Sequence, residues 1–71
     1  MYRIRCGDIV RFRSRKQRVL GTSPDKEKVK LVPVRKNGRS GQWDPVSQTH
    51  WYGVGFVKDE AVFLEKSPAT R

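Results

Sequence analysis

Apolar residues alternate with polar ones along most of this chain, and nowhere do they recur convincingly at the spacing of an α-helix. The alternation is clearest in residues 2–6, 10–13, 28–34 and 51–57. A period of two places successive side chains on opposite faces of a β-strand, whereas an amphipathic helix needs a period of about 3.6. We therefore predict an all-β chain.

Turn signals divide this pattern into five short strands. We expect strands over residues 2–12, with a break at Gly7-Asp8, and over residues 19–21, 29–34, 51–57 and 61–64. Residues 15–18 are interpreted as a polar connection, and residues 22–25 as a turn in which Pro24 presets φ. Residues 35–50 form one long loop in this interpretation, unless Asn37-Gly38 closes a hairpin.

The length of 71 residues limits the chain to one small domain. We assign that domain to residues 1–66 and interpret residues 67–71 as a disordered tail. Five short strands with turns between them describe a small barrel or sandwich, and closing the sheet removes exposed strand edges. Pro33 marks an edge or the end of the third strand, because proline cannot donate to a strand ladder.

Two short segments also resemble a known class of fold. The stretch Cys6-Gly7-Asp8-Ile9-Val10-Arg11-Phe12 resembles the Gly-Asp-x-Val start of small SH3-like barrels, including the KOW-type modules. Residues 61–65 resemble the last strand of the same folds. The resemblance covers residues 4–65 and implies a five-stranded, strongly bent barrel. It implies no function, because this fold carries many.

The chain is strongly basic, and its charge is unevenly spread. It has 16 Lys and Arg against 7 Asp and Glu, a formal net charge of +9. Residues 1–20 contribute +6, residues 21–40 contribute +4, and residues 41–71 contribute −1. Such a surface attracts polyanions or acidic protein surfaces.

Arginine dominates the basic residues of the first 20 positions. The planar guanidinium group makes bidentate contacts with phosphate or carboxylate, which lysine cannot make. We expect a continuous stripe along two strand segments that flank Gly7-Asp8, although an exposed face kept soluble by its charge would have the same pattern. The candidate residues are Arg3, Arg5, Arg11, Arg13, Arg15, Lys16 and Arg18.

A second group of candidates lies further along the chain. The basic loop that contains Arg35, Lys36 and Arg39 could wrap a phosphate backbone or stay solvated. Trp43 and Trp51 are candidates for stacking on bases, for covering the mouth of the barrel or for anchoring a protein interface. The remaining aromatic candidates, Tyr52 and Phe56, are interpreted as core, and Lys26, Lys28 and Lys30 as a solvated edge.

Catalytic and metal-binding patterns are scarce. Cys6 and His50 are the only thiol and imidazole ligands, whereas a structural zinc site needs about four ligands. We expect no metal and no cofactor, and we expect Cys6 to be buried beside Ile4. We take the proximity of Asp44 and Ser47 to His50 as chance, so no enzyme is predicted.

The cysteine count and the apolar runs of the sequence favour a place in the cytoplasm. A single cysteine permits no internal disulfide, which favours a reducing cytoplasm. No apolar run approaches the roughly 18 residues of a membrane span, and no signal-peptide segment is recognised.

The sequence favours a small module that binds RNA or DNA, largely through the nucleic-acid backbone. The alternative is a protein–protein interaction module, an accessory subunit or a phage-type inhibitor, which docks its basic surface on an acidic protein. Neither interpretation involves a membrane or a small-molecule substrate.

Overall fold

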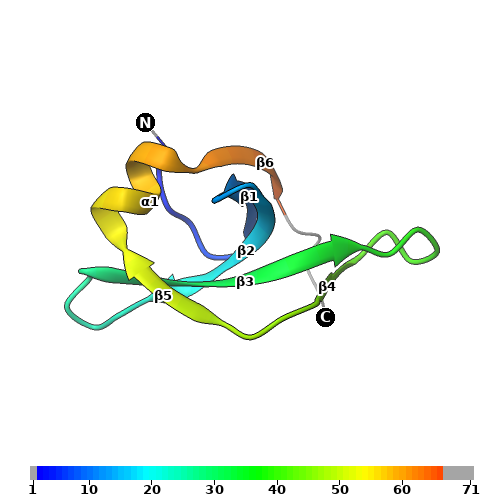
Figure 1. Ribbon diagram of the computed structural model, residues 1–71, viewed down its shortest axis with the longest axis horizontal. Helices are drawn as coiled ribbons and strands as arrows, with labels where there is room; N and C mark the ends of the chain where they lie inside the picture. The colour runs from blue at the N-terminus through cyan, green and yellow to red at the C-terminus, as the bar shows by residue number, and fades with distance from the viewer. Residues whose placement is uncertain (1, 67–71) are drawn as a thin grey trace.

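The computed structural model describes residues 2–66, most of which belong to one antiparallel sheet (Figure 1). The elements are β1 (Asp8–Phe12), β2 (Arg15–Thr22), β3 (Lys28–Lys36), β4 (Trp43–Pro45), β5 (His50–Gly53), α1 (Val54–Glu60) and β6 (Val62–Lys66). The strand order is β4-β3-β2-β1-β6, and β5 also pairs with β3. The prediction of a mainly β fold is confirmed, with six strands instead of five and one short helix.

A tight hairpin joins β1 to β2. Residues 15–18 belong to β2, so their interpretation as a polar connection is wrong. Phe12 pairs with Arg15, so the loop consists of Arg13 and Ser14 alone. Both loop residues have positive φ values, 56° and 63°, as a two-residue hairpin turn of this hand requires. Neither Arg nor Ser signals such a turn, and the sequence therefore hid it.

The prediction of a third strand is confirmed by β3, but Pro33 lies inside this strand and does not end it. The Pro33 carbonyl accepts a hydrogen bond from the Val46 amide. The backbone polar edge of Pro33 therefore points to the side of β3 opposite β2. On that side, β5 pairs with residues 28–31 and β4 pairs with residues 34–36. Pro33 therefore occupies the gap between two partner strands, where the missing N–H leaves no ladder bond unmade.

The expected loop over residues 35–50 is wrong in part, because β3 and β4 form a hairpin that projects from the body (Figure 1). Its turn is fixed by Asn37, whose side-chain oxygen accepts hydrogen bonds from the Arg39 and Ser40 amides. Gly41 closes the turn at a φ of 72°. The alternative of a hairpin at Asn37-Gly38 thus describes this region better.

The predicted strand over residues 51–57 is also wrong in its second half. Strand β5 ends at Gly53, and α1 follows at once. Val57 and Ala61 are buried and Val54 packs against them, a spacing of three and four residues that fits one face of a helix. Phe56, interpreted as core, is only partly so: its ring packs edge-on against Phe12, with the centroids 5.3 Å apart, but 47% of the residue remains exposed. The alternation of Tyr52, Val54 and Phe56 concealed this helical spacing.

Two apolar clusters lie on opposite faces of the sheet. The inner face is the one that packs against α1 and the N-terminal segment, and its cluster is Tyr2, Val10, Phe12, Val19, Val29, Leu31, Val57 and Ala61. The outer face carries a smaller cluster of Ile9, Val32, Val34 and Trp43. Alternate residues of β3 supply both clusters, so this strand is buried on both faces.

The N-terminal segment differs from the prediction. Residues 2–5 are not a strand, and Cys6 and Gly7 form a turn. Cys6 is exposed instead of buried, and its thiol donates to the Leu20 carbonyl at 3.2 Å. No helix within residues 2–66 is long and apolar enough to cross a membrane. The tail predicted over residues 67–71 lies outside the described residues.

Candidate functional site

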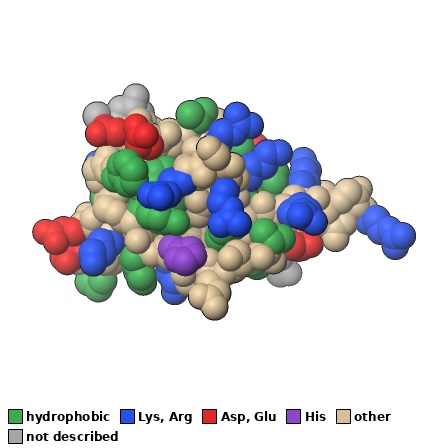
Figure 2. Space-filling model, viewed as in Figure 1, with side chains coloured by type: hydrophobic (Ala, Val, Ile, Leu, Met, Phe, Trp, Pro, Cys, Tyr) green, Lys and Arg blue, Asp and Glu red, His purple; other side chains and the backbone are tan. Residues whose placement is uncertain are grey.

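A basic groove opens where β2 begins and β3 ends. It encloses about 330 Å³, and we call it the cationic groove. It is lined by Arg15, Lys16, Pro33, Val34, Arg35, Lys36, Trp43 and Val46. Figure 2 shows Lys and Arg side chains spread over the middle and right of one face, while acidic side chains gather mainly at its left end.

Antiparallel pairing brings the four cations together from positions about 20 residues apart. The β2–β3 ladder ends where Gln17 pairs with Pro33, and Arg15 and Arg35, each two residues beyond this pair, line the same groove. The groove therefore joins the arginine-rich segment to the basic loop, which are separate candidates in the sequence. Within residues 2–66, no Asp or Glu lines this groove.

Like charges face one another on neighbouring strands at this site. Arg11 pairs directly with Lys16 across β1 and β2, and Arg15 and Arg35 line the same groove from β2 and β3. Directly opposed like charges destabilise a sheet. Such an arrangement disfavours the isolated fold slightly and becomes favourable when an anion binds between the cations.

Trp43 forms the floor of the cationic groove and is not an exposed stacking surface. The indole is only 5% exposed, because pairing of Lys36 with Trp43 lays the ring over Val32 and Val34. The Nζ atoms of Lys16 and Lys36 each lie 5.6 Å from the ring centroid, a cation–π distance. Of the alternatives for Trp43, stacking on bases is contradicted by this burial, and the ring instead covers the outer cluster beneath the two lysines.

Arg18 also has a structural role. This residue is half-buried, and its Nη2 donates a hydrogen bond to the Trp43 carbonyl. Arg18 therefore ties β2 to the β3–β4 hairpin beneath the groove. It contributes positive charge to the site, but its guanidinium is already engaged by the backbone.

Two carboxylates border the groove. Glu65 Oε1 lies 3.7 Å from Lys36 Nζ, and both side chains are about half exposed. Asp44 is opposite Arg35 in the β3–β4 pairing and accepts a hydrogen bond from Asn37. Glu65 therefore offsets part of the positive charge of Lys36 at the border of the groove.

Trp51 is the exposed tryptophan of the described chain. It lies on β5, is 51% exposed, and pairs directly with Lys30 of β3. Lys30 Nζ lies 5.6 Å from the indole centroid. The interpretation of Lys30 as part of a solvated edge misses this contact, and the even position of Lys30 on β3, shared with Lys36, is the sequence signal that places it on the outer face.

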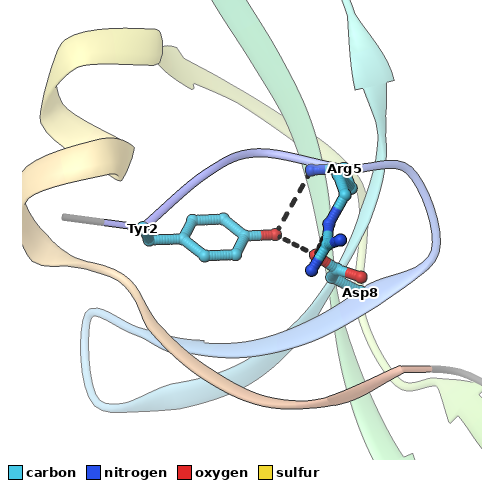
Figure 3. Close-up of polar contacts among 3 residues, drawn as sticks. All are labelled: Tyr2, Arg5 and Asp8. Atoms are coloured by element: carbon cyan, nitrogen blue, oxygen red, sulfur yellow. Dashed lines mark hydrogen bonds and ion pairs between the residues drawn. The ribbon is translucent and has the colours of Figure 1, made fainter.

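Arg3 and Arg5 belong to a different surface, so the predicted stripe of arginines along two strand segments is wrong. They line a second pocket of about 440 Å³ beside β6. Arg5 Nε lies 3.6 Å from the buried carboxylate of Asp8, to which the Tyr2 hydroxyl donates at 2.7 Å (Figure 3). Burial and this hydrogen bond raise the pKa of Tyr2 above its ordinary value. Arg5 therefore belongs to a contact that fastens the N-terminal segment.

The remaining candidates lie in turns. Arg13 is in the β1–β2 turn and Arg39 is in the β3–β4 turn, both exposed. Pro33, Val34 and Val46 were not predicted as groove residues, and their apolar character gives no sign of this role. No group of three or more His, Cys, Asp or Glu side chains in residues 2–66 is arranged to hold a metal ion.

Comparison with models of known protein families, with curated proteins and with solved structures finds no match to this chain. The function must therefore be inferred from the geometry of the site.

Proposed function

We propose that this chain is a small nucleic-acid-binding module that contacts the phosphate backbone through the cationic groove. The observation that carries this proposal is the convergence of Arg15, Lys16, Arg35 and Lys36 in a groove without a carboxylate in its lining. Arginine and lysine side chains are regular partners of phosphate oxygens in protein–nucleic acid complexes. The opposed like charges favour the same ligand, since they are relieved by a chain of regularly spaced anions.

We also infer that the sheet closes into a small SH3-like barrel. β1 pairs with β2 on one side and with β6 on the other, so the first and last strands are neighbours. The ring centroids of Phe12 on β1 and Tyr52 on β5 lie 4.9 Å apart across the inner face. Contact between strands from the two halves of one sheet supports a rolled sheet over a flat one.

The salt dependence of binding tests the proposed function. If four cations each neutralise one phosphate, affinity falls by about 50- to 150-fold between roughly 50 and 200 mM salt. Binding is measured by fluorescence anisotropy with labelled DNA and RNA, single-stranded and duplex. The absence of binding to every one of these probes at low salt would reject the proposal.

A matched pair of double variants separates the groove from net charge. Arg15→Gln/Arg35→Gln should lower the salt slope by about half, because it removes two of four contacts. Lys26→Gln/Lys58→Gln removes the same charge from another exposed surface and should leave the slope nearly unchanged. Equal effects of the two pairs would show that only net charge matters.

A second candidate function, a protein interface, is favoured by the pocket beside β6. There Arg3 and Arg5 adjoin the exposed side chains of Val62 and Phe63. Arginine and aromatic residues are enriched at protein interfaces. Capture of one acidic protein from lysate, unchanged after nuclease treatment and lost in Phe63→Ser, would favour this candidate, whereas loss of all partners after nuclease treatment favours nucleic acid.

A further inference from the structure

Strand β3 presents two lysine–tryptophan pairs on the outer face of the sheet. Lys36 pairs with Trp43 of β4, and Lys30 pairs with Trp51 of β5. In each pair the lysine Nζ lies 5.6 Å from the indole centroid. Lys30 and Lys36 are six residues apart on one strand, so they share a face and are separated by about 20 Å.

The two pairs differ in the availability of the ring. Trp43 is 5% exposed and is approached by a second lysine, Lys16, so no ring surface is left for a ligand. Trp51 is 51% exposed and has Lys30 as its lysine neighbour. An indole held beside a cation with half of its surface in water is a flat apolar platform in a positive field.

A nucleobase is the flat ligand that suits both features of this platform. Its π-face stacks on an aromatic ring, and the phosphates on either side of it are attracted to Lys30. In a duplex each base is already stacked and paired, so its face is not available to stack on an indole at the protein surface. A single strand has free base faces, and it can extend along β3 from Trp51 to the cationic groove.

We propose that the chain binds single-stranded nucleic acid in preference to duplex, with phosphates in the cationic groove and a base stacked on Trp51. This inference rests on the proposed function, since it assumes that the groove binds the backbone. It adds the class of nucleic acid and assigns the two tryptophans different roles. Trp43 supports the lysines of the groove, whereas Trp51 contacts the ligand.

Three labelled probes of about 12 nucleotides, within the site sizes typical of small single-strand-binding folds, test the inference. They are a single strand of thymidine or uridine, a duplex of the same length, and an abasic sugar–phosphate strand. Binding of each is measured by fluorescence anisotropy at low salt. The single strand should bind more tightly than the duplex, and the abasic strand should bind more weakly than the single strand.

Variants at Trp51 assign the difference to stacking. Trp51→Ala should weaken binding of the single strand by about 5- to 150-fold, because base stacking on an aromatic ring is lost. It should leave the abasic strand unaffected, and Trp51→Phe should retain most of the affinity. Arg15→Gln/Arg35→Gln should weaken binding of all three probes. An unchanged thermal midpoint of Trp51→Ala confirms that the variant is folded.

The outcomes distinguish this inference from the proposed function. If the duplex binds as tightly as the single strand and Trp51→Ala binds like the parent protein, the inference is wrong and the proposed function stands. If Trp51→Ala weakens the abasic strand as much as the base-containing strand, stacking is also rejected. If no probe binds at low salt, the proposed function fails, and this inference fails with it.

Discussion

The two faces of the sheet are closed in different ways. The inner cluster is covered by the chain's own backbone elements: α1 contributes Val57 and the N-terminal segment contributes Tyr2. The outer cluster is covered by Trp43 and the long side chains of Lys16 and Lys36. Long basic side chains can shield apolar surface with their methylene groups while their charges remain in water.

This difference shows how a chain of 71 residues can fold and still present a charged surface. The inner face uses apolar burial and one buried carboxylate. The outer face uses a single large ring to cover a small cluster, and it keeps its cations exposed around that ring. If the two faces are held in these different ways, the outer face depends on the Trp43 ring and on the balance of its exposed charges, and the inner face depends on the N-terminal segment.

The largest expected effect concerns the ring that closes the outer face. Trp43→Ala should lower the free energy of unfolding by about 3–5 kcal/mol, because it leaves a cavity over Val32 and Val34. Trp51→Ala should lower it by less than about 0.5 kcal/mol, because the ring is half exposed. Urea denaturation of both variants measures the contrast. Similar losses in the two variants would show that the outer cluster is not held by Trp43.

The next effect concerns the N-terminal segment over the inner face. Tyr2→Phe removes the hydroxyl that donates to the fully buried carboxylate of Asp8. A buried acceptor that loses its donor costs about 1–3 kcal/mol. Urea denaturation at neutral pH should show this loss. A change below about 0.5 kcal/mol would mean that water or Arg5 replaces the hydroxyl.

The same hydroxyl predicts a dependence of stability on alkaline pH. The pKa of Tyr2 is raised above its ordinary value of 10.0 by burial and by the hydrogen bond to Asp8. The unfolded chain therefore loses this proton at a lower pH than the folded chain. The contribution of Tyr2 is fully present below about pH 10 and is lost as the pH rises towards the folded pKa, at no more than about 1.4 kcal/mol per pH unit.

Tyr2→Phe supplies the comparison for that measurement, because it removes the Tyr2 hydroxyl and leaves every other ionisable side chain in place. The free energy of unfolding is measured at several pH values between about 9 and 11. The difference between parent and variant should shrink as the pH rises. A constant difference over this range would contradict the raised pKa of Tyr2.

Alternation of apolar and polar residues predicted a strand correctly where that strand pairs with neighbours inside the sheet, as β3 does. Val29 and Leu31 alternate with lysines, and β3 lies where they indicate. The same alternation misled at residues 2–6, because Tyr2 and Ile4 pack on the inner face from an extended segment outside the sheet. Local spacing cannot distinguish these cases, since pairing with a distant strand decides between them.

The candidate site was only partly predictable for a related reason. Residue type alone identified Arg15, Lys16, Arg35 and Lys36, because clustered cations are visible in any sequence. Their convergence depends on the antiparallel pairing of β2 with β3, and β2 begins as early as Arg15 because of the turn at Arg13-Ser14, whose positive φ values are unusual for these residues. The opposite exposures of the two tryptophans depend on which strand pairs with each half of β3, which no local pattern encodes.

The smallest expected effect concerns the charge balance of the outer face. Glu65→Gln removes the carboxylate 3.7 Å from Lys36 Nζ, and an exposed ion pair of this kind is worth about 0.2–1 kcal/mol. Release of Lys36 should therefore strengthen nucleic-acid binding by up to about fivefold at low salt, with little change in the thermal midpoint. The gain should disappear at high salt, because exposed charges are screened.

Glu60→Gln on α1 removes the same charge at an exposed position that does not line the groove. An equal gain in that control would assign the effect to net charge and not to competition for Lys36.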